Sequence, residues 1–175
     1  MENLMEMLEH GQLDVALSYK PLQSYDDIDS HILFNSNLCV IAGKDNPVAK
    51  KERIRLAELE NLPLVLPAKG LQARNAFDSL LYGQNFKFDV RLEINDLSML
   101  LDMVSRTNLV TLLSGATIHS NKNFVAISLD HPHSEMQGSF HLLKGTYCKN
   151  ATKEFLKMLV ENNSFLMAME AIANR

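Results

Sequence analysis

The chain has 175 residues, of which 46% are hydrophobic and 22% are charged, and its formal net charge is −4 at pH 7. This length suits one domain or two small ones, and the composition is that of an ordinary soluble globular protein. The negative charge argues against a general nucleic-acid-binding surface, and the sequence holds no apolar run long enough to span a bilayer.

The two cysteines, Cys39 and Cys148, have neither metal-binding nor redox spacing. Cys39 lies in an apolar run and is interpreted as a small core residue, so we expect no disulfide framework. The sequence does not open with the basic-then-apolar layout of a secretory signal. These features together predict a cytoplasmic protein.

The first residues predict a helix followed by a strand. Apolar side chains recur at helical spacing over residues 4–8, His10 suits the end of a helix, and Gly11 can close it in a left-handed conformation. The apolar run 13–17 then indicates a strand buried on both faces, as in a parallel sheet. Asp14, its only charge, is interpreted as a turn residue that bonds nearby backbone amides.

The rest of the chain predicts strands and helices that follow one another for most of its length. In chain order we expect strands at 28–34 and 38–42, a helical turn at 56–59, a strand at 64–66, a helix at 71–82, a strand at 88–94, a helix at 97–106, strands at 109–113, 124–127 and 139–143, and helices at 152–160 and 164–173. This order favours a mainly parallel α/β sheet.

Strand ends supply the candidate ligand-binding residues, because ligands bind beyond the carboxyl ends of strands in open α/β sheets. The polar or small residues at these ends are Ser18, Ala68, Lys69, Gly70, Asn95, Asp96, Ser98 and Ser114. Three of these strand ends run straight into helical patterns, whose free backbone amides favour an anion. Lys69 and Arg74 would add positive charge there, although a solvated loop lysine and a surface helix arginine are the ordinary alternatives. Asn95 and Ser98 also suit helix capping.

Nothing in the sequence favours catalysis or metal binding. His131 and His133 stand two apart without a cysteine or a carboxylate pair beside them. Nucleophile-elbow, phosphate-loop and dinucleotide-binding motifs are missing, and Ser114-Gly115 lacks the flanking glycine and the base that a nucleophile needs. We therefore predict a protein that is not an enzyme and that uses neither a cofactor nor a metal.

The order of these motifs resembles that of LysR-type transcriptional regulators. The segments that carry the resemblance are 8–17, 38–49, 54–59, 93–95, 101–104 and 109–113. Asn46 and Val48 replace the usual His and Leu of the family's turn, and Ser114 stands where Pro is common. The resemblance runs from about residue 4 to about residue 160 and is closest to the cyanate-operon regulator-like subgroup.

The resemblance implies an α/β fold like that of type 2 periplasmic binding proteins, with two α/β lobes and a central cleft. It assigns residues 1–22 and 129–175 to regulatory lobe I and residues 23–128 to regulatory lobe II. The candidate strand-end residues would then face the cleft from both lobes. A small, anionic co-inducer bound there would shift the lobes by as much as its difference in affinity for their two arrangements.

The resemblance also implies missing parts. The family's N-terminal winged helix-turn-helix, through which it binds DNA, has no counterpart here, and neither does the first strand–helix–strand of lobe I. Lobe I should therefore be incomplete, with an exposed sheet edge and an apolar patch beside residues 13–17 that a second chain could cover. We expect a homo-oligomer that does not bind membranes.

Three functional hypotheses remain open. The chain could be the effector-sensing module of a transcription regulator, or a decoy subunit that pairs with a full-length regulator. It could instead be a stand-alone solute-binding protein or a small enzyme of the same fold, but the sequence has neither a secretory leader nor a catalytic constellation. The sequence does not name the effector, the target promoter or the direction of regulation.

Overall fold

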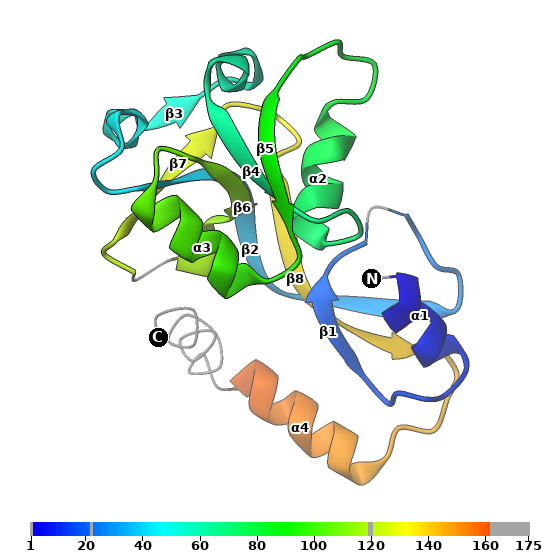
Figure 1. The fold of residues 1–175 in the computed structure, drawn as a ribbon. Helices are drawn as coiled ribbons and strands as arrows, with labels where there is room; N and C mark the ends of the chain where they lie inside the picture. The colour runs from blue at the N-terminus through cyan, green and yellow to red at the C-terminus, as the bar shows by residue number, and fades with distance from the viewer. Residues whose placement is uncertain (1, 22, 119–120, 162–175) are drawn as a thin grey trace.

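The computed structural model describes residues 2–21, 23–118 and 121–161. Figure 1 shows two lobes joined by long strands. The elements are α1 (Glu2–Glu9), β1 (Ala16–Tyr19), β2 (Ile28–Gly43), η1 (Pro47–Lys50), β3 (Arg53–Ile54), η2 (Leu56–Asn61), β4 (Pro63–Pro67), α2 (Gln72–Leu80), β5 (Asp89–Ile94), α3 (Leu97–Arg106), β6 (Thr111–Ser114), η3 (Gly115–Ile118), β7 (Phe124–Leu129), β8 (Glu135–Leu143) and α4 (Asn150–Glu161).

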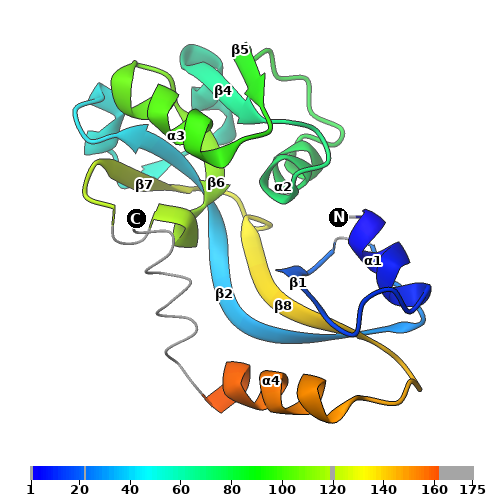
Figure 2. The ribbon, with the colours of Figure 1, turned by 60° about the horizontal axis from the view of Figure 1, so that its bottom comes forward.

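β2 is one strand of 16 residues that passes through both lobes. Residues 28–37 pair with β8, and residues 38–43 pair with β6 and β7. Figure 2 shows β2 and β8 running side by side between the lobes. The two strands predicted at 28–34 and 38–42 are therefore one. The polar residues 35–37 continue the ladder because β8 supplies their partners, which the local sequence does not reveal.

The small lobe consists of α1, β1, the first part of β2, β8 and α4. Met5 and Leu8 of α1 are fully buried and pack with Ala16 and Ile28 into a separate apolar cluster. Burial of each such large side chain contributes about 1.5–3 kcal/mol, so this cluster fixes α1 to the sheet. In Figure 2, α4 lies on the other side of these strands. Its Phe155 is 38% exposed.

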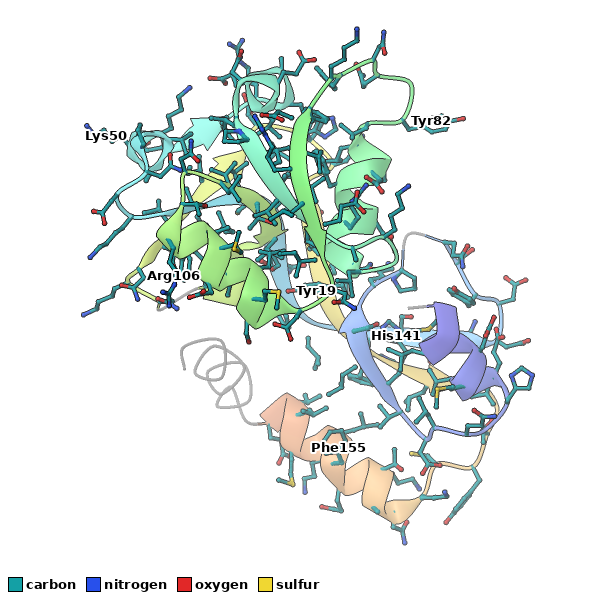
Figure 3. All side chains as sticks on the ribbon, viewed as in Figure 1. Tyr19, Lys50, Tyr82, Arg106, His141 and Phe155 are labelled. Carbon is teal, nitrogen blue, oxygen red and sulfur yellow. The ribbon has the colours of Figure 1, made fainter. Side chains whose placement is uncertain are left out.

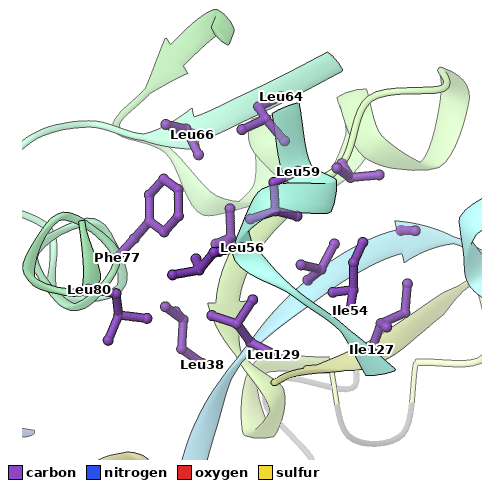
Figure 4. Close-up of a cluster of buried hydrophobic side chains, with 14 of the residues drawn as sticks. Leu38, Ile54, Leu56, Leu59, Leu64, Leu66, Phe77, Leu80, Ile127 and Leu129 are labelled. Atoms are coloured by element: carbon purple, nitrogen blue, oxygen red, sulfur yellow. The ribbon is translucent and has the colours of Figure 1, made fainter. Parts of the chain in front are cut away.

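The large lobe consists of the second part of β2, β3–β7, α2 and α3. Side chains alternate along β2, so Leu38, Val40 and Ala42 belong to one core cluster, and Cys39 and Ile41 to another. The first cluster, drawn in Figure 4, includes the buried face of α2, and the second includes that of α3. The two helices therefore cover opposite faces of the strands. The prediction that Cys39 is a core residue is confirmed.

The prediction of a mainly parallel sheet is wrong. The order β1-β8-β2-β7-β3 defines the larger sheet, in which β6 also pairs with β2, and only β3 and β7 run parallel in it. β4 and β5 form a parallel pair of their own. β2 and β8, which pass between the lobes, run in opposite directions. The order of strands and helices along the chain therefore did not predict the direction of the strands.

The first strand also differs from its prediction. β1 covers 16–19 rather than 13–17 and is an edge strand of the larger sheet; Ala16 is buried but Leu17 is 39% exposed. Burial on both faces is therefore wrong. Among the described residues, no strand pairs with the outer edge of β1, in agreement with the predicted sheet edge. Asp14 pairs with Lys149 at 2.9 Å instead of bonding nearby amides. Gly11 has φ 66°, as its predicted role requires.

The helix predicted at 164–173 lies outside the described residues. The helix predicted at 97–106 is α3 with the same bounds. Within the described ranges, we find no helix that combines the length and the apolar character needed to cross a membrane.

Candidate functional site

Tyr19, the last residue of β1, joins the two lobes (Figure 3). Its ring packs at the margin of the large-lobe core that contains Leu38, and stands edge-on to Phe34 with a centroid distance of 6.0 Å. Burial raises the pKa of Tyr19, and the nearby side chains of Ser114 and Thr117 offset part of that rise.

Ser114 belongs to a small network of hydroxyl groups at the end of β6. Its Oγ lies 2.7 Å from Ser36 Oγ of β2, and the Ala116 amide lies 3.3 Å from both oxygens. Ser114 is 1% exposed. The strands β2 and β6 therefore meet at a buried polar contact between Ser36 and Ser114.

A pocket of about 250 Å³ lies beside Tyr19, and both lobes form it. Its lining residues are Tyr19, Lys20, Pro21, Gln72, Ala76, Glu135, Met136 and Gln137. Gln72 Nε2 of α2 donates to the Lys20 carbonyl at 3.3 Å, and the Lys20 amide donates to the Gln137 carbonyl at 2.6 Å. The lining thus combines an ammonium, a carboxylate and amides with apolar surface, which suits a polar molecule smaller than a typical drug.

The predicted strand-end residues do not line this pocket. Ser18 precedes Tyr19, and Ala68, Lys69 and Gly70 form the loop before α2, where Gly70 has φ 87°. Ser18 and the 68–70 loop therefore lie close in the chain to the pocket residues Tyr19 and Gln72, although Lys69 itself is exposed.

The start of α3 carries the other predicted group. Asn95, Asp96 and Ser98 are exposed. Asp96 is the N-cap, because its carboxylate accepts a hydrogen bond from the Met99 amide at 2.7 Å. The capping roles predicted for Asn95 and Ser98 are therefore wrong: Asn95 precedes the cap, and Ser98 lies within the helix.

Arg74 is not the free cation that an anion site would need. It is 8% exposed; its Nε lies 2.8 Å from Asp78 Oδ1, and its Nη1 lies 2.8 Å from Glu93 Oε1 and 3.3 Å from the Pro67 carbonyl. Burial works to lower the pKa of Arg74, but the hydrogen bonds that it donates to Glu93 and Asp78, together with their negative charge, outweigh burial and raise that pKa. Arg74 therefore fixes α2 to β4 and β5.

His141 is a residue that the sequence patterns did not single out. It is fully buried in β8, with Nε2 2.9 Å from Ser18 Oγ and Nδ1 2.8 Å from Ser30 Oγ. Burial lowers its pKa, which favours the neutral ring. Only the pairing of β8 with β1 and β2 brings both serines to His141, so local sequence carries no signal for this group.

Across the described residues, we find no cluster of three or more side chains suited to a metal ion.

Comparison with known proteins gives the family. Residues 1–164 match the LysR substrate binding domain. The chain belongs to this LysR family. Among curated relatives, it is 30% identical over 94 residues to the HTH-type transcriptional activator CmpR of Synechocystis, a match that covers 54% of this chain and 31% of CmpR. It is 28% identical over 114 residues to the transcriptional dual regulator GltC of Bacillus subtilis, covering 65% and 38% of the two chains. The chain therefore spans less than two fifths of the length of these regulators.

Solved structures of LysR regulatory domains share the fold. The CcmR regulatory domain of Synechocystis, in complex with 2-PG, superposes with a TM-score of 0.79 at 21% identity, covering 91% of this chain and 78% of that one. The effector-binding domain of QuiR, in complex with shikimate, superposes with a TM-score of 0.76 at 18% identity, covering 92% and 77%. The predicted LysR relationship and the periplasmic-binding-protein-like fold are confirmed.

Proposed function

We propose that this chain is the effector-sensing regulatory domain of a LysR-type bacterial transcription regulator, and that a small anionic molecule binds between its lobes. The observation that supports this most is the pocket of about 250 Å³, to which the small lobe contributes Tyr19 and Lys20 and the large lobe contributes α2. The solved relatives named above hold 2-PG and shikimate, which are both small carboxylates.

The proposal includes the division of the chain into residues 1–22 and 129–175 as lobe I and 23–128 as lobe II. The pairing of residues 28–37 with β8 supports an extension of lobe I into the first half of β2. Lys20 would contact the anion directly, and Lys69 and the strand-end residues Ser18, Asn95 and Ser114 would bound a wider cleft.

DNA binding belongs, in this proposal, to a winged helix-turn-helix domain outside these residues, and the protein acts in the cytoplasm as an oligomer. A decoy subunit for a full-length regulator is the second candidate, which the unpaired edge of β1 supports. Co-purification with a full-length regulator distinguishes it from a self-associating sensor. A stand-alone solute-binding protein of the same fold would bind its ligand without either partner.

A thermal-shift screen with cyanate, benzoate and 2-phosphoglycolate tests the proposal. A ligand at about one hundred times its Kd stabilises the folded state by about 2.7 kcal/mol, which raises the Tm by several degrees. If the anion occupies the pocket, Lys20→Met abolishes the shift; if it occupies the helix start, Lys69→Ala does so. Lys157→Ala, on the exposed side of α4, is the control. No response to any anion, or a shift that survives in both Lys20→Met and Lys69→Ala, would contradict an anion site between the lobes.

A further inference from the structure

Gly138 of β8 leaves a gap between two aromatic side chains of the neighbouring strands. Tyr19 of β1 and Phe34 of β2 both stand opposite Gly138, one on each side of β8. Because neighbouring strands lie about 4.8 Å apart, a side chain at position 138 would ordinarily separate such residues. Glycine has none, and the two rings stand edge-on with a centroid distance of 6.0 Å. The contact between these rings therefore depends on glycine at position 138.

The Phe34 ring fills the gap closely. A Cβ at position 138 would lie less than 3.0 Å from three atoms of that ring, a separation that real Cβ contacts do not show. The register between β2 and β8 slips between Ile32 and Phe34, so Phe34 rather than Leu33 stands opposite Gly138. A glycine in one strand and an irregularity in the next thus act together to bring the Phe34 ring beside Tyr19.

The place of the Tyr19 side chain matters because it lines the interlobe pocket of about 250 Å³. Gly138 and Phe34 do not line this pocket, although Gln137, the chain neighbour of Gly138, does. Phe34 can therefore influence a molecule in the pocket through the position of Tyr19, without touching that molecule.

We propose that Gly138 and Phe34 are positioning residues for the pocket. The glycine admits the Phe34 ring, and the ring holds the Tyr19 side chain as a fixed wall against which a bound molecule packs. A wall that is already in place strengthens binding, because the bound molecule does not have to order it. The biological meaning of this arrangement rests on the function proposed above, but the packing and the position of Tyr19 can be tested without a ligand.

An exchange of side-chain size between positions 138 and 34 tests the packing. Gly138 does not have a positive φ, so alanine fits its backbone and adds only the Cβ. Gly138→Ala should lower the Tm by about 2–12 °C through overpacking, and Phe34→Leu alone should lower it by leaving a cavity. In the Gly138→Ala background, Phe34→Leu should instead raise the Tm, because leucine makes room for the added Cβ. An equal effect of Phe34→Leu in the two backgrounds would overturn the proposal.

Fluorine NMR tests the position of Tyr19 directly. The chain has four tyrosines, so labelling with meta-fluorotyrosine gives few signals, and Tyr19→Phe identifies that of Tyr19. Phe34→Leu should shift the Tyr19 signal, because it removes the ring beside it. Phe86→Leu is the matched control, because Phe86 also belongs to an aromatic pair, with Phe88 at a centroid distance of 5.6 Å, and does not line the pocket. A Tyr19 signal that ignores Phe34→Leu, or that responds equally to Phe86→Leu, would contradict the positioning role.

Calorimetric titration with 2-phosphoglycolate tests the consequence for binding. Phe34→Leu should raise the Kd by about twofold to tenfold, the cost of ordering one side chain, whereas Phe86→Leu should leave the Kd unchanged. A Kd that is the same for Phe34→Leu and the unmodified chain would refute the positioning role. If the unmodified chain does not bind 2-phosphoglycolate, the proposed ligand fails, while the Tm values and the fluorine signals still decide whether Phe34 positions Tyr19.

Discussion

At the scale of single residues, two charged side chains each have an ion-pair partner that their local sequence does not indicate. Arg74 looks like a surface helix residue, yet the paired carboxylates of Asp78 and Glu93 bury it. Asp14 looks like a turn residue, yet it pairs with Lys149 from the far end of the chain. Asp78 lies only four residues from Arg74, but Glu93 lies 19 residues away, and Lys149 lies 135 residues from Asp14. Local patterns identify residue chemistry but not such distant partners, so these two pairings became visible only in the fold.

His141 should make the stability of the protein depend on pH. The unfolded histidine has a pKa near ~6.5, and burial lowers the folded value. The contribution of His141 to the stability is complete above the unfolded pKa and is lost as the pH falls through the folded pKa, because the unfolded chain binds the proton first. Urea unfolding between about pH 7 and 5 should therefore show a smaller loss for His141→Gln than for the unmodified protein.

His133→Gln, at an exposed loop histidine, is the control for this prediction. Glu58, whose pKa is lowered to about 2 by its hydrogen bond with Lys51, titrates at lower pH and does not confuse the result. An identical pH slope for His141→Gln and the unmodified protein would show that the buried ring carries no such energy.

At the scale of elements, helices were predicted better than strands. α3 matched because apolar spacing and end signals are local, and Leu100 and Val104 are buried as expected. Strand pairing is not local, so the continuity of β2, the antiparallel order and the residues of the pocket escaped prediction. The same reason explains Tyr19, whose neighbours come from β2, β6 and β8.

The N-terminus of α3 offers a direct energetic test. Asp96→Ala removes the carboxylate that accepts the Met99 amide and should destabilise the protein by about 1 kcal/mol. Asn95→Ala, one position earlier and equally exposed, should change the stability by less than about 0.5 kcal/mol. The midpoint of urea unfolding measures both. Equal losses in the two variants would mean that the cap contributes nothing specific.

At the scale of the whole molecule, the outer edge of β1, which no strand of the described part of the chain pairs with, should promote association. The exposed Leu17 adds apolar area to the free strand edge. Sedimentation should show oligomers whose fraction rises with concentration, and Leu17→Lys should shift them toward monomer. Leu92→Lys, on the exposed β5 of the other sheet, is the matched control. A monomer at every concentration, or dissociation by Leu92→Lys alone, would assign no role to β1.

β2 limits how the lobes can move relative to each other. Its backbone is held by β8 on one half and by β6 and β7 on the other, with no flexible loop between the halves. Such a strand acts as a torsion bar: reorientation must be absorbed as added twist over a few peptide units, rather than by free rotation at a joint. The structure therefore favours swivels of small amplitude, and a signal carried by them depends on the stiffness of the strand.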